Sequence, residues 1–136
     1  MNHEDLPTLE LALPGPLRDS GVAAIIAGEK TALTGLLQIL QHAGEPVPKS
    51  GDQFSVVNSA GQSAAIIELT DVQLVRICEV DDDYAHAEGR GYADADEWRR
   101  AHEEFFQSDG VTEFLGATAV IDDETLVVTE RFRLIE

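Results

Sequence analysis

The stretch QFSVVNSAGQSAAIIELTDVQLVRI, residues 53–77, decides the fold class of this sequence. It contains three runs rich in β-branched and aliphatic residues, at Gln53 to Val57, Ser63 to Leu69 and Val72 to Ile77. The first two runs are separated by Asn58-Ser59-Ala60-Gly61, a combination that favours a tight turn. Short runs at such close spacing predict three strands that follow one another as a meander.

A fourth β run closes the chain, from Leu126 to Ile135. Residues alternate along it with the period of two that is typical of a half-buried strand. The predicted inward side chains are Leu126, Val128, Phe132 and Leu134, and the predicted outward ones are Val127, Thr129, Arg131 and Arg133. Glu130 breaks the pattern, because its carboxylate falls on the inward side.

Three helices are predicted, from Leu17 to Ala27, from about Asp81 to Glu88 and from about Asp94 to Gln107. Pro16 suits a first helical turn, and Gly28 stands where a left-handed C-terminal cap is expected. Residues 31–43 are mostly apolar and fit either a strand or a short helix. Because strands stand both before and after the helices, the sequence predicts an α+β domain built on a small β-barrel with short surrounding helices.

The length of 136 residues and the 43% hydrophobic content suit one self-sufficient core. We expect residues 1–9 to form a flexible leader and residues 10–136 to form a single domain. Cys78 is the one cysteine, which excludes an internal disulfide and indicates a reducing compartment. No charge-free apolar run approaches the ~18 residues that a membrane span needs, and the N-terminus lacks the basic start of a secretory signal. We therefore expect a cytoplasmic protein with no membrane partner.

The charge balance limits the partners further. The chain has 26 acidic residues against 9 basic ones, and its formal net charge is -17. Broad binding to duplex DNA depends on many lysines and arginines that replace the counterions of the phosphates. This composition disfavours such binding and leaves ligands that a small local cleft can recognise.

The segment GEKTALTG, residues 28–35, resembles the signature of the ASCH family, small relatives of the PUA RNA-binding domains. The resemblance continues through GEPVP at 44–48, Gly51-Asp52, the strand pair ending in Glu68, EGRGY at 88–92, EWR at 97–99 and ERF at 130–132. It therefore spans residues 10–135 and is similar to the stand-alone small bacterial type. It implies a PUA-like β-barrel with short helices and a cleft where the GEKTALTG loop meets the EGRG segment, residues 88–91.

The resemblance also implies candidate functions. The family is proposed to bind RNA, while some stand-alone bacterial members look like amidohydrolases for N4-acetylcytidine and others like metal-stimulated ribonucleases. In the amidohydrolase members the working residues are a lysine, a threonine three residues later and a glutamate from the later glycine-rich segment. Lys30 matches the lysine, but the threonine position falls on Leu33 and the glutamate position on Arg90.

These two differences alter the chemistry that the resemblance implies. Leucine has no nucleophilic group, and arginine cannot act as a base near neutral pH. If the loop is displaced by one residue, Thr34 takes the hydroxyl role, with Glu88 or Glu130 as the acid. Arg90 could instead hold an anion opposite Lys30.

Two hypotheses of different classes follow. In the first, a non-catalytic or weakly catalytic ASCH module binds a nucleotide, nucleoside or short RNA in a cleft lined by Lys30, Thr31, Thr34 and Arg90. In the second, the protein is an amidohydrolase on N4-acylated cytidine-type nucleosides, with Lys30, Thr34, Glu88 and Glu130 as candidate catalytic residues. A carboxylate within hydrogen-bonding reach of both Lys30 and a threonine hydroxyl would favour the second. Neither hypothesis calls for a cofactor or a metal.

Three other patterns have simpler structural interpretations. A ribonuclease that uses a divalent ion near Asp81-Asp82-Asp83 and His86 ranks last, because the spacing of a calcium loop is missing and a solvated helix start explains the aspartates. Trp98, Phe105 and Phe106 have helical spacing and are expected in the core rather than stacked on a base. His102 is expected to pack beside Trp98 rather than to bind a ligand.

Overall fold

The computed structural model of the chain describes residues 6–11 and 14–135. The strands are β1 (Thr8–Glu10), β2 (Ala32–Leu36), β3 (Gln53–Val57), β4 (Ser63–Arg76) and β5 (Leu126–Leu134). The helices are α1 (Pro16–Ile26), α2 (Leu37–Ala43), α3 (Asp82–Ala87), α4 (Ala95–Phe106) and α5 (Asp109–Leu115), and a 3₁₀ turn, η2, spans Ile77–Glu79. The prediction of an α+β domain is confirmed.

The five strands form one sheet in the order β1-β3-β4-β5-β2. Neighbouring strands are antiparallel except β1 and β3, which run parallel. In the part of the chain that the structure describes, the two edge strands β1 and β2 do not pair with each other. The expected small barrel is therefore an open, barrel-like sheet, and the open side lies between β1 and β2.

The predicted meander of three strands is corrected to two. The runs Ser63 to Leu69 and Val72 to Ile77 belong to the single strand β4, which continues through an irregularity between Leu69 and Asp71. Thr70 and Asp71 are polar and interrupt the alternation, so they resemble a turn in the sequence. A β-bulge accommodates one extra residue without ending the pairing, and here it lets β4 pair with both β3 and β5.

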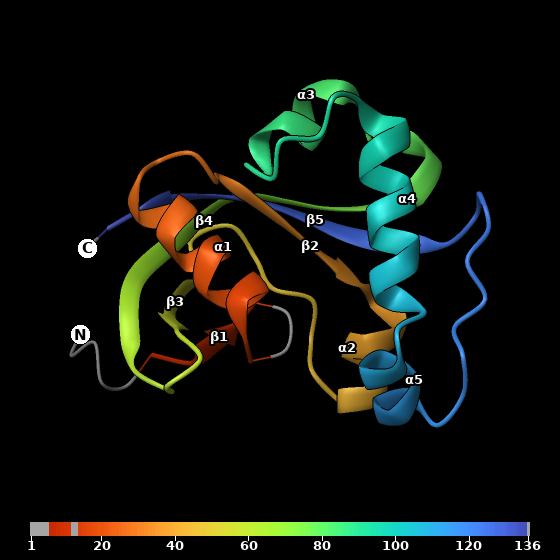
Figure 1. Ribbon diagram of the computed structural model, residues 1–136, viewed down its shortest axis with the longest axis horizontal. Coiled ribbons are helices and arrows are strands. Elements are labelled where there is room, and N and C mark those ends of the chain that lie inside the picture. The colour runs from red at the N-terminus through yellow and green to blue at the C-terminus, as the bar shows by residue number, and fades with distance from the viewer. Residues whose placement is uncertain (1–5, 12–13, 136) are drawn as a thin grey trace.

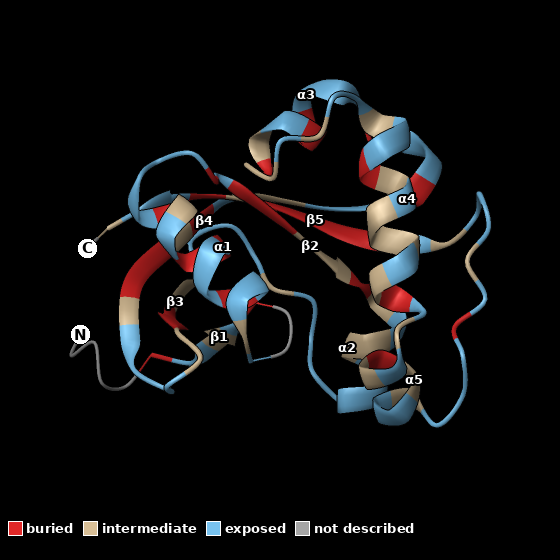
Figure 2. Ribbon diagram, viewed as in Figure 1, coloured by how far each residue is buried: buried red, intermediate tan, exposed pale blue. Residues whose placement is uncertain are grey.

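The predicted faces of β5 are also corrected. Val127 was expected to point outward but is fully buried, whereas Leu126 and Leu134 were expected inward and are 38% and 41% exposed. The cause is the position of β5 between β4 and β2, where side chains on both of its faces enter a core: Val127 packs in one hydrophobic cluster and Phe132 in another. Figure 2 shows this strand as one of the most deeply buried segments of the chain.

Two hydrophobic clusters pack against the sheet. The α1 core joins that helix to the strands near it and consists of Leu11, Val22, Ile25, Leu33, Val56, Ala65, Ile67, Leu69 and Phe132. The α4 core consists of Ala32, Leu36, Ile77, Val80, Tyr84, Ala85, Trp98, Phe106, Ala119 and Val127. Figure 1 shows α1 over the half of the molecule that holds β1 and β3, and α3 and α4 at the other half. The opening between β1 and β2 therefore lies between the α1 core and the α4 core.

The helix signals account for most of the observed helices. Pro16 opens α1, and Gly28 beyond its end has a φ of 79°, as expected for a left-handed cap. The ambiguous segment 31–43 contains both alternatives, β2 followed directly by α2. Helix α5 was not predicted, although Ser108 caps its first turn and Gly116 its last. None of the helices in the described ranges is long and apolar enough to cross a membrane.

The last two residues of the predicted flexible leader, residues 1–9, lie in a strand. Residues 8 and 9 belong to β1, because the strand pairs in parallel with Ser55–Val57 of β3. Residues 1–5 of the predicted leader lie outside the described residues.

Gly89 lies where two loops that are far apart in the sequence pack against each other. The amide of Thr31 donates to the carbonyl of Ala87 at 2.8 Å, which ties the loop after α1 to the end of α3. Gly89 follows with a φ of 68°, and a Cβ atom added there would lie 2.5 Å from the carbonyl oxygen of Glu29. Only glycine fits both the left-handed conformation and this close approach.

We expect Gly89→Ala to destabilise the fold more than Gly91→Ala. Both glycines have positive φ, but a Cβ at Gly91 meets nothing within 4 Å. The conformational strain alone is about 1–2 kcal/mol, so Gly91→Ala should cost about that much, and Gly89→Ala should cost more because backbone must move. Urea unfolding of the two variants measures the difference. Equal losses would mean that the contact between the two loops tolerates a side chain.

Candidate active-site cleft

Most of the predicted site residues line a cleft of about 580 Å³ on the open side of the sheet. Both edge strands line it, β1 through Leu9 and Glu10, and β2 through residues 33–36. Most of its other lining side chains are apolar and come from α1, α2, α4 and α5. A few polar groups interrupt this apolar wall: Lys30, Thr34, Glu88, Arg90, His102 and Glu130.

Lys30 and Glu88 meet as a buried pair in this cleft. Their side chains are only 4% and 5% exposed, and Nζ of Lys30 lies 3.5 Å from Oε1 of Glu88. The same Nζ donates to the backbone carbonyl of Glu88 at 3.1 Å. The carboxylate therefore comes from Glu88, two residues before the position that the resemblance aligns with Arg90.

Thr34 completes the arrangement. Its hydroxyl donates to Oε2 of Glu88 at 2.6 Å. Oγ1 of Thr34 also lies 3.1 Å from the hydroxyl of Tyr84, whose own proton goes to the carbonyl of Leu33. Lys30, Thr34 and Glu88 are thus brought together, with one carboxylate within reach of both the amine and the hydroxyl, as amide hydrolysis requires.

Two residues of α4 hold the Glu88 carboxylate and were not predicted as part of the site. The indole Nε1 of Trp98 donates to Oε2 of Glu88 at 2.6 Å, and Nε2 of His102 lies 3.2 Å from the same oxygen. The imidazole of His102 stacks on Trp98 as expected, with ring centroids 4.2 Å apart. Its Nδ1 faces the carbonyl of Trp98 at 2.8 Å. The two ring nitrogens of His102 thus face one carbonyl oxygen and one carboxylate oxygen, both of which accept hydrogen bonds.

The electrostatics separate the roles of Glu88 and Lys30. Burial alone would raise the pKa of Glu88, but the hydrogen bond and charge of His102, the charge of Lys30 and the Thr34 hydrogen bond together lower it to about 2. Glu88 is therefore ionised at neutral pH. Burial lowers the pKa of Lys30 below its ordinary value, although Glu88 opposes this. Lys30 is consequently the better proton acceptor of the two.

The other two predicted ligand contacts lie differently. Arg90 lines the cleft but donates to Oγ of Ser20 at 2.9 Å and to the carbonyl of Leu17 at 3.2 Å. Gly21 makes room for it, since a Cβ there would lie 2.5 Å from the guanidinium. The guanidinium N–H groups of Arg90 therefore hold α1, and the same N–H groups would be needed to bind an anion. Thr31 is exposed, does not line the cleft, and its hydroxyl faces the carbonyl of Ala87.

Glu130 lies in the cleft on the α1 side of the sheet. It is 7% exposed and pairs in register with Leu33 of β2 and Val72 of β4. In the described part of the chain its carboxyl group forms no hydrogen bond and no ion pair. Burial raises the pKa of Glu130 to about 7. This carboxyl group thus differs sharply from Glu88 in the same cleft.

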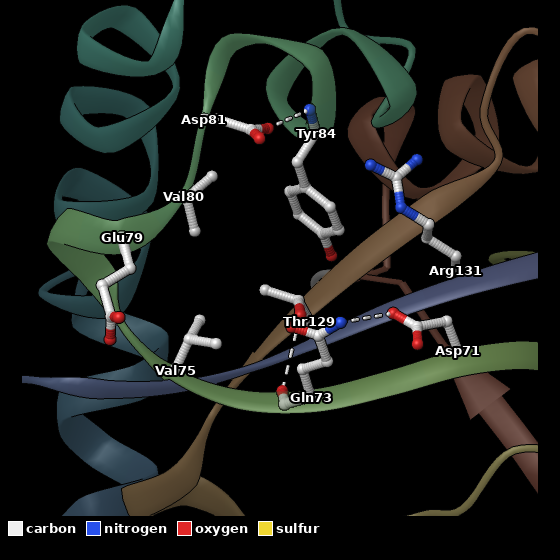
Figure 3. Close-up of a pocket in the computed structure, with 9 residues that line it drawn as sticks. All are labelled: Asp71, Gln73, Val75, Glu79, Val80, Asp81, Tyr84, Thr129 and Arg131. Carbon is white, nitrogen blue, oxygen red and sulfur yellow. Dashed lines mark hydrogen bonds between the residues drawn. The ribbon is translucent and has the colours of Figure 1, made fainter.

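A second, smaller cavity of about 160 Å³ lies against the far side of Tyr84 (Figure 3). It is more polar, and Asp71, Asp81 and Arg131 contribute to its wall. The aspartate run has structural partners here: Asp81 caps α3 through the amide of Tyr84, Asp82 accepts from the amide of Ala95, and Asp83 pairs with Arg131. Within the residues described, no group of three acidic, histidine or cysteine side chains is arranged to hold a metal ion.

We expect Glu130→Gln to stabilise the protein above neutral pH. Between pH 4.5 and 7 the folded chain keeps the Glu130 proton that the unfolded chain has lost, so the free energy of unfolding falls as pH rises through this window. The variant has no carboxyl group to ionise and does not lose stability in this way. Its free energy of unfolding should therefore exceed that of the wild type by on the order of 2–3 kcal/mol at pH 8, and by little at pH 4.5. Urea unfolding at both pH values measures it. Glu29→Gln, at an exposed glutamate, is the control; an equal gain at both pH values would contradict the expectation.

Comparison with known proteins agrees with this architecture. A model of the ASCH domain matches residues 12–136. The crystal structure of the ASCH domain from Lactobacillus crispatus JV V101 is 27% identical, with a TM-score of 0.80, and the match covers 95% of this chain and 79% of that one. Protein EF3133 from Enterococcus faecalis V583 has the same fold at 22% identity, with a TM-score of 0.82 and coverage of 95% and 76%. The comparison with curated proteins finds no match.

The family match extends over both sides of the cleft, since it includes the GEKTALTG loop, the EGRG segment and the closing strand. The expected PUA-like α+β architecture is confirmed by the observed fold and by its structural neighbours. The chain belongs to the ASCH-domain family.

Proposed function

We propose that the protein hydrolyses an amide of a small, uncharged N4-acylated cytidine-type nucleoside in the cleft. The single observation that carries this proposal is the contact of Thr34 and Lys30 with one carboxylate, that of Glu88. A hydroxyl that donates to a fixed carboxylate beside a desolvated amine has the components of an activated nucleophile. The acylated pyrimidine nucleoside as substrate class comes from the family resemblance.

The charges of the cleft support an uncharged substrate. Lys30 has a carboxylate beside it, and two donors of Arg90 are already directed at α1. A phosphate would therefore find few free cationic groups, and it would lie near Glu88 and Glu130. A nucleoside without phosphate avoids this repulsion, whereas a nucleotide or an RNA strand does not.

The proposed reaction requires Lys30 to lose its proton before it can accept another, and burial makes this loss easier because it lowers the pKa of the amine. Oγ1 of Thr34 bonds to the amide carbonyl carbon while the hydroxyl proton passes through Glu88 to Lys30. The C–N bond then breaks as Lys30 returns this proton to the leaving amine nitrogen. Water hydrolyses the resulting Thr34 ester, which releases the carboxylic acid and restores the hydroxyl. His102 and Trp98 keep Glu88 in place throughout.

The test is hydrolysis of N4-acetylcytidine by the purified chain and by Thr34→Val and Lys30→Met variants. Removal of the hydroxyl or the amine should lower kcat by at least about 10²-fold, the usual contribution of a positioned acid or base. Thr34→Ser should keep most of the activity. Thr31→Val is a matched control, because Thr31 lies on the same loop but outside the cleft, and it should change the rate by less than about twofold.

Two outcomes would contradict the proposal. Full activity of Thr34→Val would exclude Thr34 as the nucleophile, and an absence of turnover by the wild type would exclude hydrolysis of this amide. Folding of each variant is checked by its unfolding curve, so that a lost rate is not mistaken for a lost fold.

A non-catalytic ASCH module that binds a nucleotide, nucleoside or short RNA is the second candidate. Leu33 favours it, because a leucine stands at the family's hydroxyl position and packs into the α1 core. This candidate predicts Lys30-dependent binding of cytidine or short RNA without turnover. RNA binding that weakens as salt is raised from low to physiological concentration would distinguish the RNA ligand from the nucleoside.

A further inference from the structure

Glu130 has no structural task that would explain its burial. Its side chain is nine-tenths buried against Leu33 and Val72, and no residue in the described ranges bonds to its carboxyl group. Among the described residues no fully buried side-chain oxygen or nitrogen lacks a hydrogen-bond partner, so the unpaired oxygens of Glu130 reach the surface of the cleft that the residue lines. A partner in the cleft can therefore reach this group.

The cleft has two apolar halves with the polar groups between them. Leu9, Leu11 and Leu33 line one half and belong to the α1 core or pack against it. Leu36, Ile39, Phe105 and Phe106 line the other half and belong to or contact the α4 core. Glu130 lies on the α1 side, on the face of β5 that carries Phe132, whereas Thr34 and Glu88 contact residues of the α4 side. A substrate cleaved at Thr34 can therefore place its two ends in different halves.

We propose that Glu130 is a specificity-determining residue that binds the heteroaromatic ring of the substrate through a paired hydrogen bond. The ring edge that fits offers an acceptor beside an N–H donor, as cytosine does with N3 and the exocyclic nitrogen. A carboxylic acid matches such an edge, since its O–H donates to the ring nitrogen and its carbonyl oxygen accepts from the N–H. The ring then occupies the half with Leu11 and Leu33, and the acyl group occupies the half with Phe105 and Phe106. This orientation rests on the proposed function, but the ring contact does not require turnover.

The groups around Glu130 are compatible with an acid that stays neutral near neutral pH. The hydroxyl of Tyr84, from α3, accepts from the backbone amide of Glu130 and leaves its carboxyl group free. The charged groups of the cleft are Lys30 before β2, Glu88 and Arg90 after α3, His102 on α4 and Glu10 on β1. None of them pairs with Glu130, and burial raises its pKa to about 7. Below that pH the group can donate.

Isothermal titration of cytidine and of N4,N4-dimethylcytidine, which lacks the N–H donor, tests the proposal. The wild type should bind cytidine at least tenfold more tightly than the dimethyl compound at pH 6, and Glu130→Leu should lose this preference. Glu130→Gln keeps one donor and one acceptor and should retain it. Cytidine affinity of the wild type should fall between pH 6 and 8.5, as the acid loses its proton, while that of Glu130→Gln should stay constant.

The outcomes separate this inference from the proposed function. If Glu130→Leu binds cytidine as the wild type does, or if the wild type does not bind cytidine, the inference is wrong even when N4-acetylcytidine is hydrolysed. If cytidine binding depends on Glu130 but no variant hydrolyses the amide, the inference stands and the proposed hydrolysis is wrong. Urea unfolding of Glu130→Leu at pH 6 checks that the variant is folded, so that a lost preference is not mistaken for a lost fold.

Discussion

The contact between the loop after α1 and the end of α3 is the constraint on which the rest of the cleft depends. A backbone hydrogen bond from Thr31 to Ala87 and the close approach of Gly89 to Glu29 join segments that are almost sixty residues apart. This contact brings the backbone carbonyl of Glu88 to Lys30 and its side chain to Thr34. Helix α4 then adds Trp98 and His102 around the same carboxylate. The backbone contact thus brings Lys30, Thr34 and Glu88 together, and the side chains of Trp98 and His102 hold the carboxylate there.

The sequence predicted the fold class and most of the elements because its local signals are strong there. Proline and glycine mark the two ends of α1, and β5 begins and ends almost where the alternation does. It failed where tertiary context outweighs local pattern. In the sequence, the polar residues of the bulge at Thr70 resemble a turn. The burial of the second face of β5 depends on neighbouring elements, which the alternation within a single strand does not reveal. Helix α5 is too short for a clear periodicity.

The candidate site shows the same division. Lys30, Thr34, Glu88 and Glu130 could be named from the motif and from the misplaced carboxylate in the last strand. The choice between Glu88 and Arg90 could not be made by alignment, because it depends on the left-handed turn at Gly89 and on the room that Gly21 leaves for Arg90. Tyr84, Trp98 and His102 were missed as site residues because aromatic side chains at helical spacing normally indicate a core. Here the core residues also carry the donors that hold Glu88.

The open side of the sheet links ligand recognition to the shape of the fold. In a closed barrel, side chains from all strands would fill the interior; here the space between β1 and β2 stays available as the cleft. Larger side chains at Leu11 or Leu33 would fill that space and increase apolar burial, and they would also remove the room for a ligand. Selection for thermal stability and selection for activity therefore act in opposite directions on the same few positions, so the residues along this opening should be the least optimised part of the core.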